Sequence, residues 1–288
     1  MTNVLYDVPG PRARIRNRVI GAITTVVVVV AIGYVVARFV ATAQFSDVRT
    51  AQFQYAAVQR ELVDGLLATL KAAAIAAVLA LVFGALLAAA RLSDRAAVRV
   101  PATWIVELFR AIPLLILIFF FYYVPLQYKL HLDTLWALVF GLTLYNGSVL
   151  AEIFRAGMLA VPRGQSEAAY AVGLRKSQVM RLVLLPQAVR AMLPAIVSQL
   201  VVLLKDTALG FIITYPELLY AAKQIGGRGA FDFPYVSSYL LAGAIYVGIC
   251  GALSAFAAWL QRRMGRAGRT AAKPLAADAV AAVERGGP

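Results

Sequence analysis

Residues 164–186 form the stretch GQSEAAYAVGLRKSQVMRLVLLP, which is polar and basic in a chain whose 288 residues are 61% hydrophobic. Ser166 is suited to cap a short helix, and Glu167 places a negative charge in its first turn, where the helix dipole favours it. Gly173 permits a turn after this helix. The pattern of residues 175–184 then predicts a second, amphipathic helix that ends before Pro186, the last residue of the stretch. The stretch therefore predicts a compact pair of helices.

Small side chains mark one side of the first of these helices. Ala168 and Ala169 favour helix, and their size lets a backbone approach another surface closely. This small face predicts a docking surface. The alternative interpretation is an ordinary amphipathic surface helix, which requires no partner.

Six apolar runs surround the stretch, and each is near the ~20 residues that a membrane-spanning helix needs. In the third run, Pro113 removes a backbone hydrogen bond and predicts a kink. The first run exceeds the ~7–15 residues of a signal-peptide core, so we expect it to remain as a helix. The sequence therefore predicts an all-α integral membrane protein with six transmembrane helices. The runs cover residues 19–40, 62–90, 101–124, 134–154, 191–215 and 236–260.

The basic residues predict the orientation of these spans. Nineteen Lys and Arg residues fall in the segments on the side of the two termini, against six on the opposite side. Basic loops stay in the cytoplasm, so both termini and residues 155–190 are expected there. A net charge of +14 does not indicate a nucleic-acid partner, because the basic residues lie in short segments between apolar runs. Membrane lipid is the expected surrounding.

The sequence offers little for catalysis or metal binding. Cys250 is the single cysteine and His131 the single histidine, so no metal site, no cofactor and no catalytic residue is predicted. A phosphate loop of the form GxxxxGK[ST] is absent from the sequence, so any ATP hydrolysis must belong to a partner. The chain is therefore not expected to be an enzyme.

The pattern Glu-Ala-Ala, three residues, Gly, nine residues, Val-Leu-Leu-Pro resembles the EAA loop of ABC importer permeases. In that family the loop forms a coupling helix that inserts into a cleft of a cytoplasmic ATPase, and the resemblance implies the same role here. The residues assigned to ATPase coupling are Gly164, Gln165, Glu167, Ala168, Ala169, Gly173, Leu185 and Pro186.

Three further segments are similar to signatures of permeases for polar amino acids. They are FRAIPLL at residues 109–115, AEIFRAGMLAVPRGQSEAA at residues 151–169 and LLKDTAL at residues 203–209. The opening YDVPGPRARIRNR and the extra first helix resemble the D-type permease subunits of bacterial glutamate importers. The resemblance implies a type I (MetI-like) permease core and a polar amino acid as substrate, with glutamate favoured.

The resemblance also implies partners, a location and an organisation. The expected partners are a cytoplasmic ABC ATPase dimer, a second homologous permease subunit in a heterodimer, and an extracytoplasmic amino acid-binding protein, all at a bacterial plasma membrane. The expected segments are a cytoplasmic basic segment at 1–18, an additional transmembrane helix with its external loop at 19–61, the permease domain at 62–260, and a cytoplasmic, disordered tail at 261–288.

Charged residues inside the spans are candidates for the translocation path. Lys205 and Asp206 lie well inside the fifth run, where burying a charge is costly, so each needs a partner or a water-filled path. As helix neighbours they point ~100° apart and cannot neutralise each other face to face. A structural ion pair to another span is the alternative, and it stays open. Its candidate partners are Asp64, Lys71 and Glu152.

Two further features complete the polar content of the spans. Lys71 and Asn146 are also path candidates, although Asn146 and Ser148 equally suit packing between helices. Glu107 and Arg110, three residues apart, are expected to pair along one helix face.

Two other functions compete with the permease. An ion-coupled secondary transporter would use intramembrane charges as a relay, but the two similar halves that such a fold predicts are not evident. A membrane-embedded enzyme would need a motif such as HExxH or GxSxG, which the sequence lacks.

Overall fold

The computed structural model describes residues 10–269, with side chains for residues 10–259, and every element in this range is helical. The predicted all-α class is confirmed. The α-helices are α1 (Pro11–Ala41), α2 (Asp47–Ala51), α3 (Ala56–Arg91), α4 (Ala96–Ala111), α5 (Leu114–Gln127), α6 (Thr134–Leu159), α7 (Arg163–Ala171), α8 (Lys176–Gln178), α9 (Leu185–Asp206), α10 (Leu218–Gly226) and α11 (Tyr235–Arg269). The 3-10 helices are η1 (Gln52–Gln54), η3 (Thr207–Ile213) and η4 (Gly229–Phe231), and η2 (Val179–Leu184) is a π-helix.

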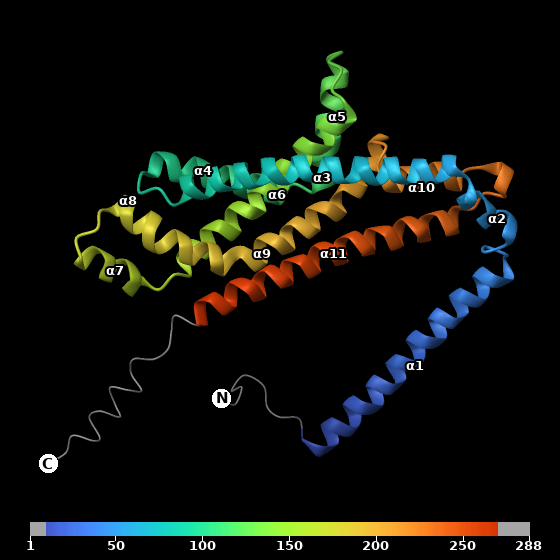
Figure 1. Cartoon of the computed structure of the whole chain (residues 1–288), viewed down its shortest axis with the longest axis horizontal. Helices are drawn as coiled ribbons and strands as arrows, with labels where there is room; N and C mark the ends of the chain where they lie inside the picture. The colour runs from blue at the N-terminus through green and yellow to red at the C-terminus, as the bar shows by residue number, and fades with distance from the viewer. Residues whose placement is uncertain (1–9, 270–288) are drawn as a thin grey trace.

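Five helical runs within residues 10–269 are long and apolar enough to cross a membrane, and α4 with α5 makes a sixth if the bent pair is one span. The prediction of a single kinked third span is therefore incomplete, because α4 and α5 meet at 96°. Ile112 precedes a proline and adopts an extended backbone, and Pro113 caps α5 without a donor N–H. These two residues separate the helices, and α5 stands out from the bundle (Figure 1).

The fifth span and the C-terminal helix are longer than predicted. One helical run extends over Lys176–Ile213, so the prediction that the amphipathic helix ends before Pro186 is wrong. Pro186 lies in the first turn of α9, directly after the π-helix η2, and the chain continues through it as helix. At the other end of the chain α11 reaches Arg269, so residues 261–269 are helical rather than disordered. The rest of the predicted tail, and residues 1–9, lie outside the described residues.

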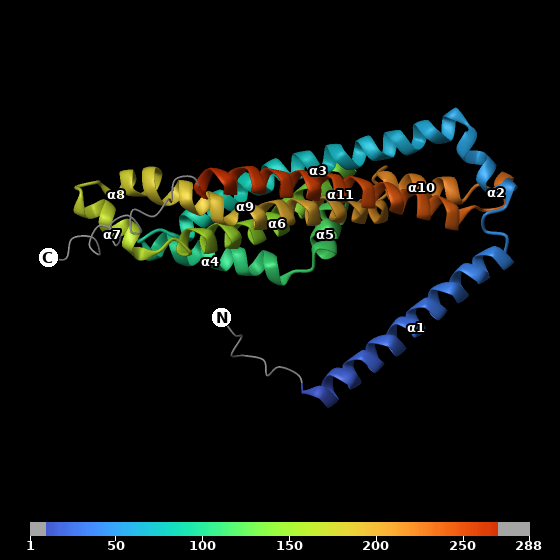
Figure 2. The ribbon, with the colours of Figure 1, turned by 60° about the horizontal axis from the view of Figure 1, so that its bottom comes forward.

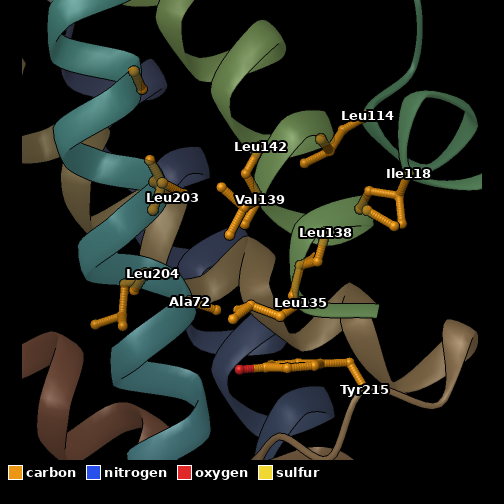
Figure 3. Packing of buried hydrophobic residues seen from close by; sticks show 14 of the residues in the cluster. Ala72, Leu114, Ile118, Leu135, Leu138, Val139, Leu142, Leu203, Leu204 and Tyr215 are labelled. Atoms are coloured by element: carbon orange, nitrogen blue, oxygen red, sulfur yellow. The ribbon is translucent and has the colours of Figure 1, made fainter. Parts of the chain in front are cut away.

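A long bundle of α3, α6, α9 and α11 forms the body of the protein (Figures 1 and 2). Its main apolar cluster joins α6 to α3, α5 and α9, and Figure 3 shows Val139 and Leu142 of α6 on the side toward Leu203 of α9. The α3 face in this cluster consists mainly of alanine, which lets α6 approach closely. Helix α1, in contrast, has no buried residue and leans away from the bundle in both views.

The closest approach of α3 and α6 depends on glycine. A Cβ atom at Gly84 would lie 2.7 Å from the carbonyl oxygen of Gly147, a backbone atom that cannot move aside cheaply. We expect Gly84→Val to separate these two helices, and overpacking of this kind typically costs ~1–3 kcal/mol. The check is the thermal unfolding temperature of the detergent-purified protein. Gly248→Val is the matched control, since a Cβ there meets nothing within 4 Å; equal unfolding temperatures in the two variants would contradict the expectation.

Candidate functional site

Helix α7 begins earlier than predicted. Its cap is Pro162 and its first residue is Arg163, so the assignment of Ser166 as the helix cap is wrong. The Ser166 hydroxyl lies inside the helix and donates to the carbonyl of Arg163 at 2.7 Å. Pro162 explains the earlier start, because proline favours the extended conformation found just before a helix.

The predicted turn after α7 is confirmed. Gly173 adopts a φ of +83°, in the left-handed region that a side chain disfavours. Its N–H donates to the carbonyl of Tyr170 at 2.9 Å, and the N–H of Leu174 donates to Ala169 at 3.2 Å. These bonds close the end of α7 and direct the chain into α8.

The small face of α7 does not act as one surface. Helix α7 packs against η2, and Ala169, at 6% exposure, is the buried residue of α7, while Val179 is the buried residue of η2. Ala169 therefore packs inward in this structure, and the docking role assigned to the two alanines stays a prediction. Adjacent residues of a helix point ~100° apart, so Ala168 is exposed together with Glu167. We call α7, the turn and α8 the bracket.

The remaining coupling candidates lie at different places on the bracket. Gly164 is exposed on α7, and Gln165 accepts a hydrogen bond from Gln187 of α9 at 3.2 Å. Leu185 lines an apolar cavity behind the bracket, and Pro186 is exposed in the first turn of α9. The structure thus brings Gly164, Glu167 and Ala168 to the outward side of α7, whereas Leu185 lines the open apolar cavity and is 42% exposed.

The bracket is tied to the spans by an ion pair that the sequence did not predict. Lys176 of α8 binds Asp94, in the loop between α3 and α4. The hydrogen bond and the positive charge of Lys176 hold the pKa of the Asp94 carboxyl below its ordinary value. The two residues are distant in sequence and have no shared motif, so no sequence signal marked this contact.

A charge network joins three helices, α3, α4 and α6. Arg91 of α3 binds Glu152 of α6 at 2.6 Å and reaches Glu107 of α4 at 3.6 Å. Glu152 also binds Arg155 at 2.6 Å. The predicted pair of Glu107 and Arg110 is confirmed at 3.6 Å. The Arg91 side chain is buried, so the network fixes α3, α4 and α6 relative to one another.

The intramembrane charges do not find the partners considered for them. Within the described residues, no ion pair involves Lys205 or Asp206. Glu152 pairs with arginines instead, Lys71 is exposed, and Asp64 lines a groove between the start of α3 and α10. Lys205 is exposed and Asp206 half-buried, which leaves both available to a partner or a path.

Asn146 has a packing contact that the sequence did not identify. It is fully buried, donates to the carbonyl of Leu142 at 3.1 Å and accepts from Gln199 of α9 at 2.7 Å. The path candidates Asn146, Lys71 and Lys205 share no hydrogen bond or ion pair in the part of the chain that the structure describes. The structure therefore does not gather them into one site.

A buried carboxylate closes the end of the bundle opposite the bracket (Figure 1). Glu217 has 0% exposure and accepts the N–H groups of Leu219 and Tyr220 at 2.8 and 2.7 Å, as the cap of α10. The Tyr246 hydroxyl of α11 donates to it at 2.6 Å, and the Thr69 hydroxyl of α3 accepts the N–H of Leu218 at 3.1 Å. Burial raises the pKa of the Glu217 carboxyl, and the hydrogen bonds oppose this shift.

The role of Glu217 was not predicted from the sequence, because the predicted apolar run at residues 191–215 ends before this residue. The signal was an acidic residue directly ahead of the helix-forming stretch LLYAA, which suits a helix cap. Beside it, an open groove of about 700 Å³ lies between the start of α3 and α10, and its lining includes the ion pair of Glu61 and Arg228. Helix α10 is thus held between α3 and α11 at this end of the bundle.

Comparison with known families and proteins gives a consistent result. The family described as binding-protein-dependent transport system inner membrane component matches residues 80–266. Glutamate transport system permease protein GluD of Corynebacterium glutamicum is 42% identical over 72% of this chain and 76% of its own length. Glutamate/aspartate import permease protein GltK of Escherichia coli is 37% identical over 70% of this chain and 92% of its own. The probable glutamine ABC transporter permease protein GlnP of Bacillus subtilis is 35% identical over 69% of this chain and 92% of its own length.

Solved structures agree in fold. The crystal structure of an amino acid ABC transporter with histidines superposes with a TM-score of 0.67 at 29% identity, over 71% of this chain and 94% of that one. An inward-facing MetNI methionine ABC transporter superposes with a TM-score of 0.60 at 23% identity, over 73% of this chain and 99% of that one. The second likeness bears on the fold alone.

Proposed function

Because the chain belongs to the family of binding-protein-dependent transport system inner membrane components, we propose that it is the permease subunit of an ATP-driven importer of a polar amino acid, with glutamate as the substrate. The observation that carries the proposal is the bracket. Helix α7 projects beyond the spans (Figure 2) and presents Glu167 and Ala168 outward, while Ala169 holds it to η2. A helix fixed from behind and exposed in front is suited to transmit force.

The partner that supplies the force is a cytoplasmic ABC ATPase. The sequence has no phosphate loop, so the hydrolysis of ATP belongs to that partner. Alternating access requires only that the ATPase bind one conformation of the permease more tightly than the other. The coupling residues are Gly164, Gln165, Glu167, Ala168 and Gly173 of the bracket, with Leu185 and Pro186 following it. They dock or position and do not catalyse.

The orientation follows from charge and geometry. The nineteen basic residues on the side of the termini support a cytoplasmic location for that side, in a bacterial plasma membrane. In Figure 1 the end of α11 lies at the same end of the bundle as α7 and α8, which supports a cytoplasmic bracket. The groove beside α10 then faces outward, where an amino acid-binding protein delivers the substrate.

A second permease subunit completes the path, which residues 62–260 of this chain form in part. Helix α5 supports this proposal, because it leaves its own bundle with Phe120 and Tyr123 more than half exposed. The unpaired Lys205 and Asp206, together with Lys71, are available to such a shared path. The names of the relatives support glutamate as the substrate. The proposed second subunit is a different, homologous permease, which makes the pair a heterodimer.

Uptake by the complete transporter tests the proposal. With its ATPase, partner permease and binding protein, the chain should support ATP-dependent uptake of labelled glutamate, and unlabelled glutamate should compete better than histidine or arginine. Disabling the phosphate loop of the ATPase should abolish uptake. Uptake that persists with the disabled ATPase and follows a proton gradient would instead establish an ion-coupled transporter.

A further inference from the structure

The helix between the bracket and α9 has an unusual register. η2 covers six residues, Val179–Leu184, with π-helical hydrogen bonding, whereas α8 before it and α9 after it are α-helical. A π-helical turn contains one residue more than the α-helical turn it replaces, and such turns are rare and frequent at functional sites. Here the turn lies where α7 packs, so the bracket is fixed to it.

The extra residue decides which side chain faces inward. On α9, Leu185, Val189 and Met192 share one face, spaced by four and three residues, and all three line the apolar cavity behind the bracket. An α-helix continued backwards from Leu185 would place Arg181 on this face. With the π-helical turn, Met180 lines the cavity and Arg181 is exposed. The register thus keeps a charge out of an apolar space.

The cavity provides room beside the turn. Its volume is about 470 Å³, and it lies between η2 with α9, the inner end of α3 and the inner end of α6. Ala85 and Ala89 of α3 line it with small side chains, and its lining also includes two flexible methionines, Met158 of α6 and Met180 of η2. Tightly packed interiors do not deform continuously, so movement of a helix needs such a space.

We propose that η2 and this cavity form the joint through which the bracket moves relative to the spans. When the ATPase pushes α7, η2 moves with it into the cavity, and the extra residue of the π-helical turn allows a change of register without breaking the packing of α9 on α6. Arg181 limits the movement, since the α-helical register would turn it toward apolar side chains. The inference rests on the proposed function, in which α7 contacts the ATPase.

Filling the cavity tests the joint. Ala89 and Ala74 are both exposed positions of α3, and of the two only Ala89 lines the cavity. Ala89→Phe therefore adds a large side chain to the lining of the space, and Ala74→Phe adds the same side chain elsewhere on the same helix. Overpacking of ~1–3 kcal/mol corresponds to a ~5–150-fold effect. In Ala89→Phe we expect uptake, and ATPase stimulation by the loaded binding protein, to fall by a factor in this range. ATPase association and basal hydrolysis should stay at the level of the parent.

A second variant keeps the test valid if Ala89→Phe does not fold. Deletion of Leu182, which is exposed, removes the extra residue and leaves Met180 four positions before Leu185, on the cavity face. This straight helix should bind the ATPase and lose stimulation. If the folded variants show the same ATPase stimulation by the loaded binding protein as the parent, the proposal that η2 and the cavity form a joint is wrong. If the parent itself fails to bind an ATPase, the proposed function is contradicted. A failure of the joint and a failure of the proposed function are therefore distinguishable.

Discussion

Replacing Ala168 with leucine should weaken ATPase binding and leave the membrane fold intact. Ala168 is exposed on α7, and leucine retains nearly the helix propensity of alanine. The added volume falls on the face that we assign to the ATPase, where overpacking costs ~1–3 kcal/mol and reduces affinity ~5–150-fold. The measurement is the ratio of ATPase to permease after purification, together with hydrolysis stimulated by the binding protein.

Two comparisons sharpen this prediction. Ala169→Leu inserts the same side chain between α7 and η2, so it should loosen the bracket itself and increase its cleavage by protease. Ala230→Leu adds leucine at an exposed position in η4, on the side away from the bracket. It should change neither the ratio of ATPase to permease nor the hydrolysis stimulated by the binding protein. A normal subunit ratio and normal stimulation in Ala168→Leu would show that this face makes no contact with the ATPase.

Replacing Glu217 with alanine should release α10 from the outer end of the bundle. The change removes the cap of α10 and leaves the Tyr246 hydroxyl and two backbone N–H groups without their buried acceptor. Losing the cap and leaving buried donors unsatisfied together cost about 2 to 5 kcal/mol. We expect a lower unfolding temperature and faster proteolysis between α10 and α11.

Asp47→Ala serves as the control for this variant, because Asp47 is exposed near the same outer surface. Uptake should fall in Glu217→Ala in proportion to the loss of folded protein at the assay temperature. Identical unfolding temperatures for the parent, the control and Glu217→Ala would mean that the buried carboxylate does not hold α10.

The spans were predictable because length and apolar composition suffice to recognise them, and each predicted run contains helix. The bend between α4 and α5 was predictable only in part. Pro113 marks a break, but the 96° angle depends on how α5 packs against α6, which no local pattern encodes. The continuation of helix through Pro186 likewise depends on the π-helical turn before it.

The sequence motif of the bracket was predictable, but which of its side chains are exposed was not. Spacing identifies Gly173 and the two alanines, but which alanine faces the ATPase depends on the packing of α7 against η2. Glu217 and the contact between Asn146 and Gln199 join residues that are remote in sequence, so they appear only in the folded chain.

Chemical crosslinking tests most directly that the bracket contacts an ATPase. Cys250 is the single cysteine of the sequence, so Cys250→Ser provides a background for one new thiol. In membranes containing the whole transporter, a short thiol-to-amine crosslinker should join the Ala168→Cys variant to the ATPase and should not join Ala230→Cys to it. A crosslink from both positions, or from neither while the subunits still copurify, would contradict the account.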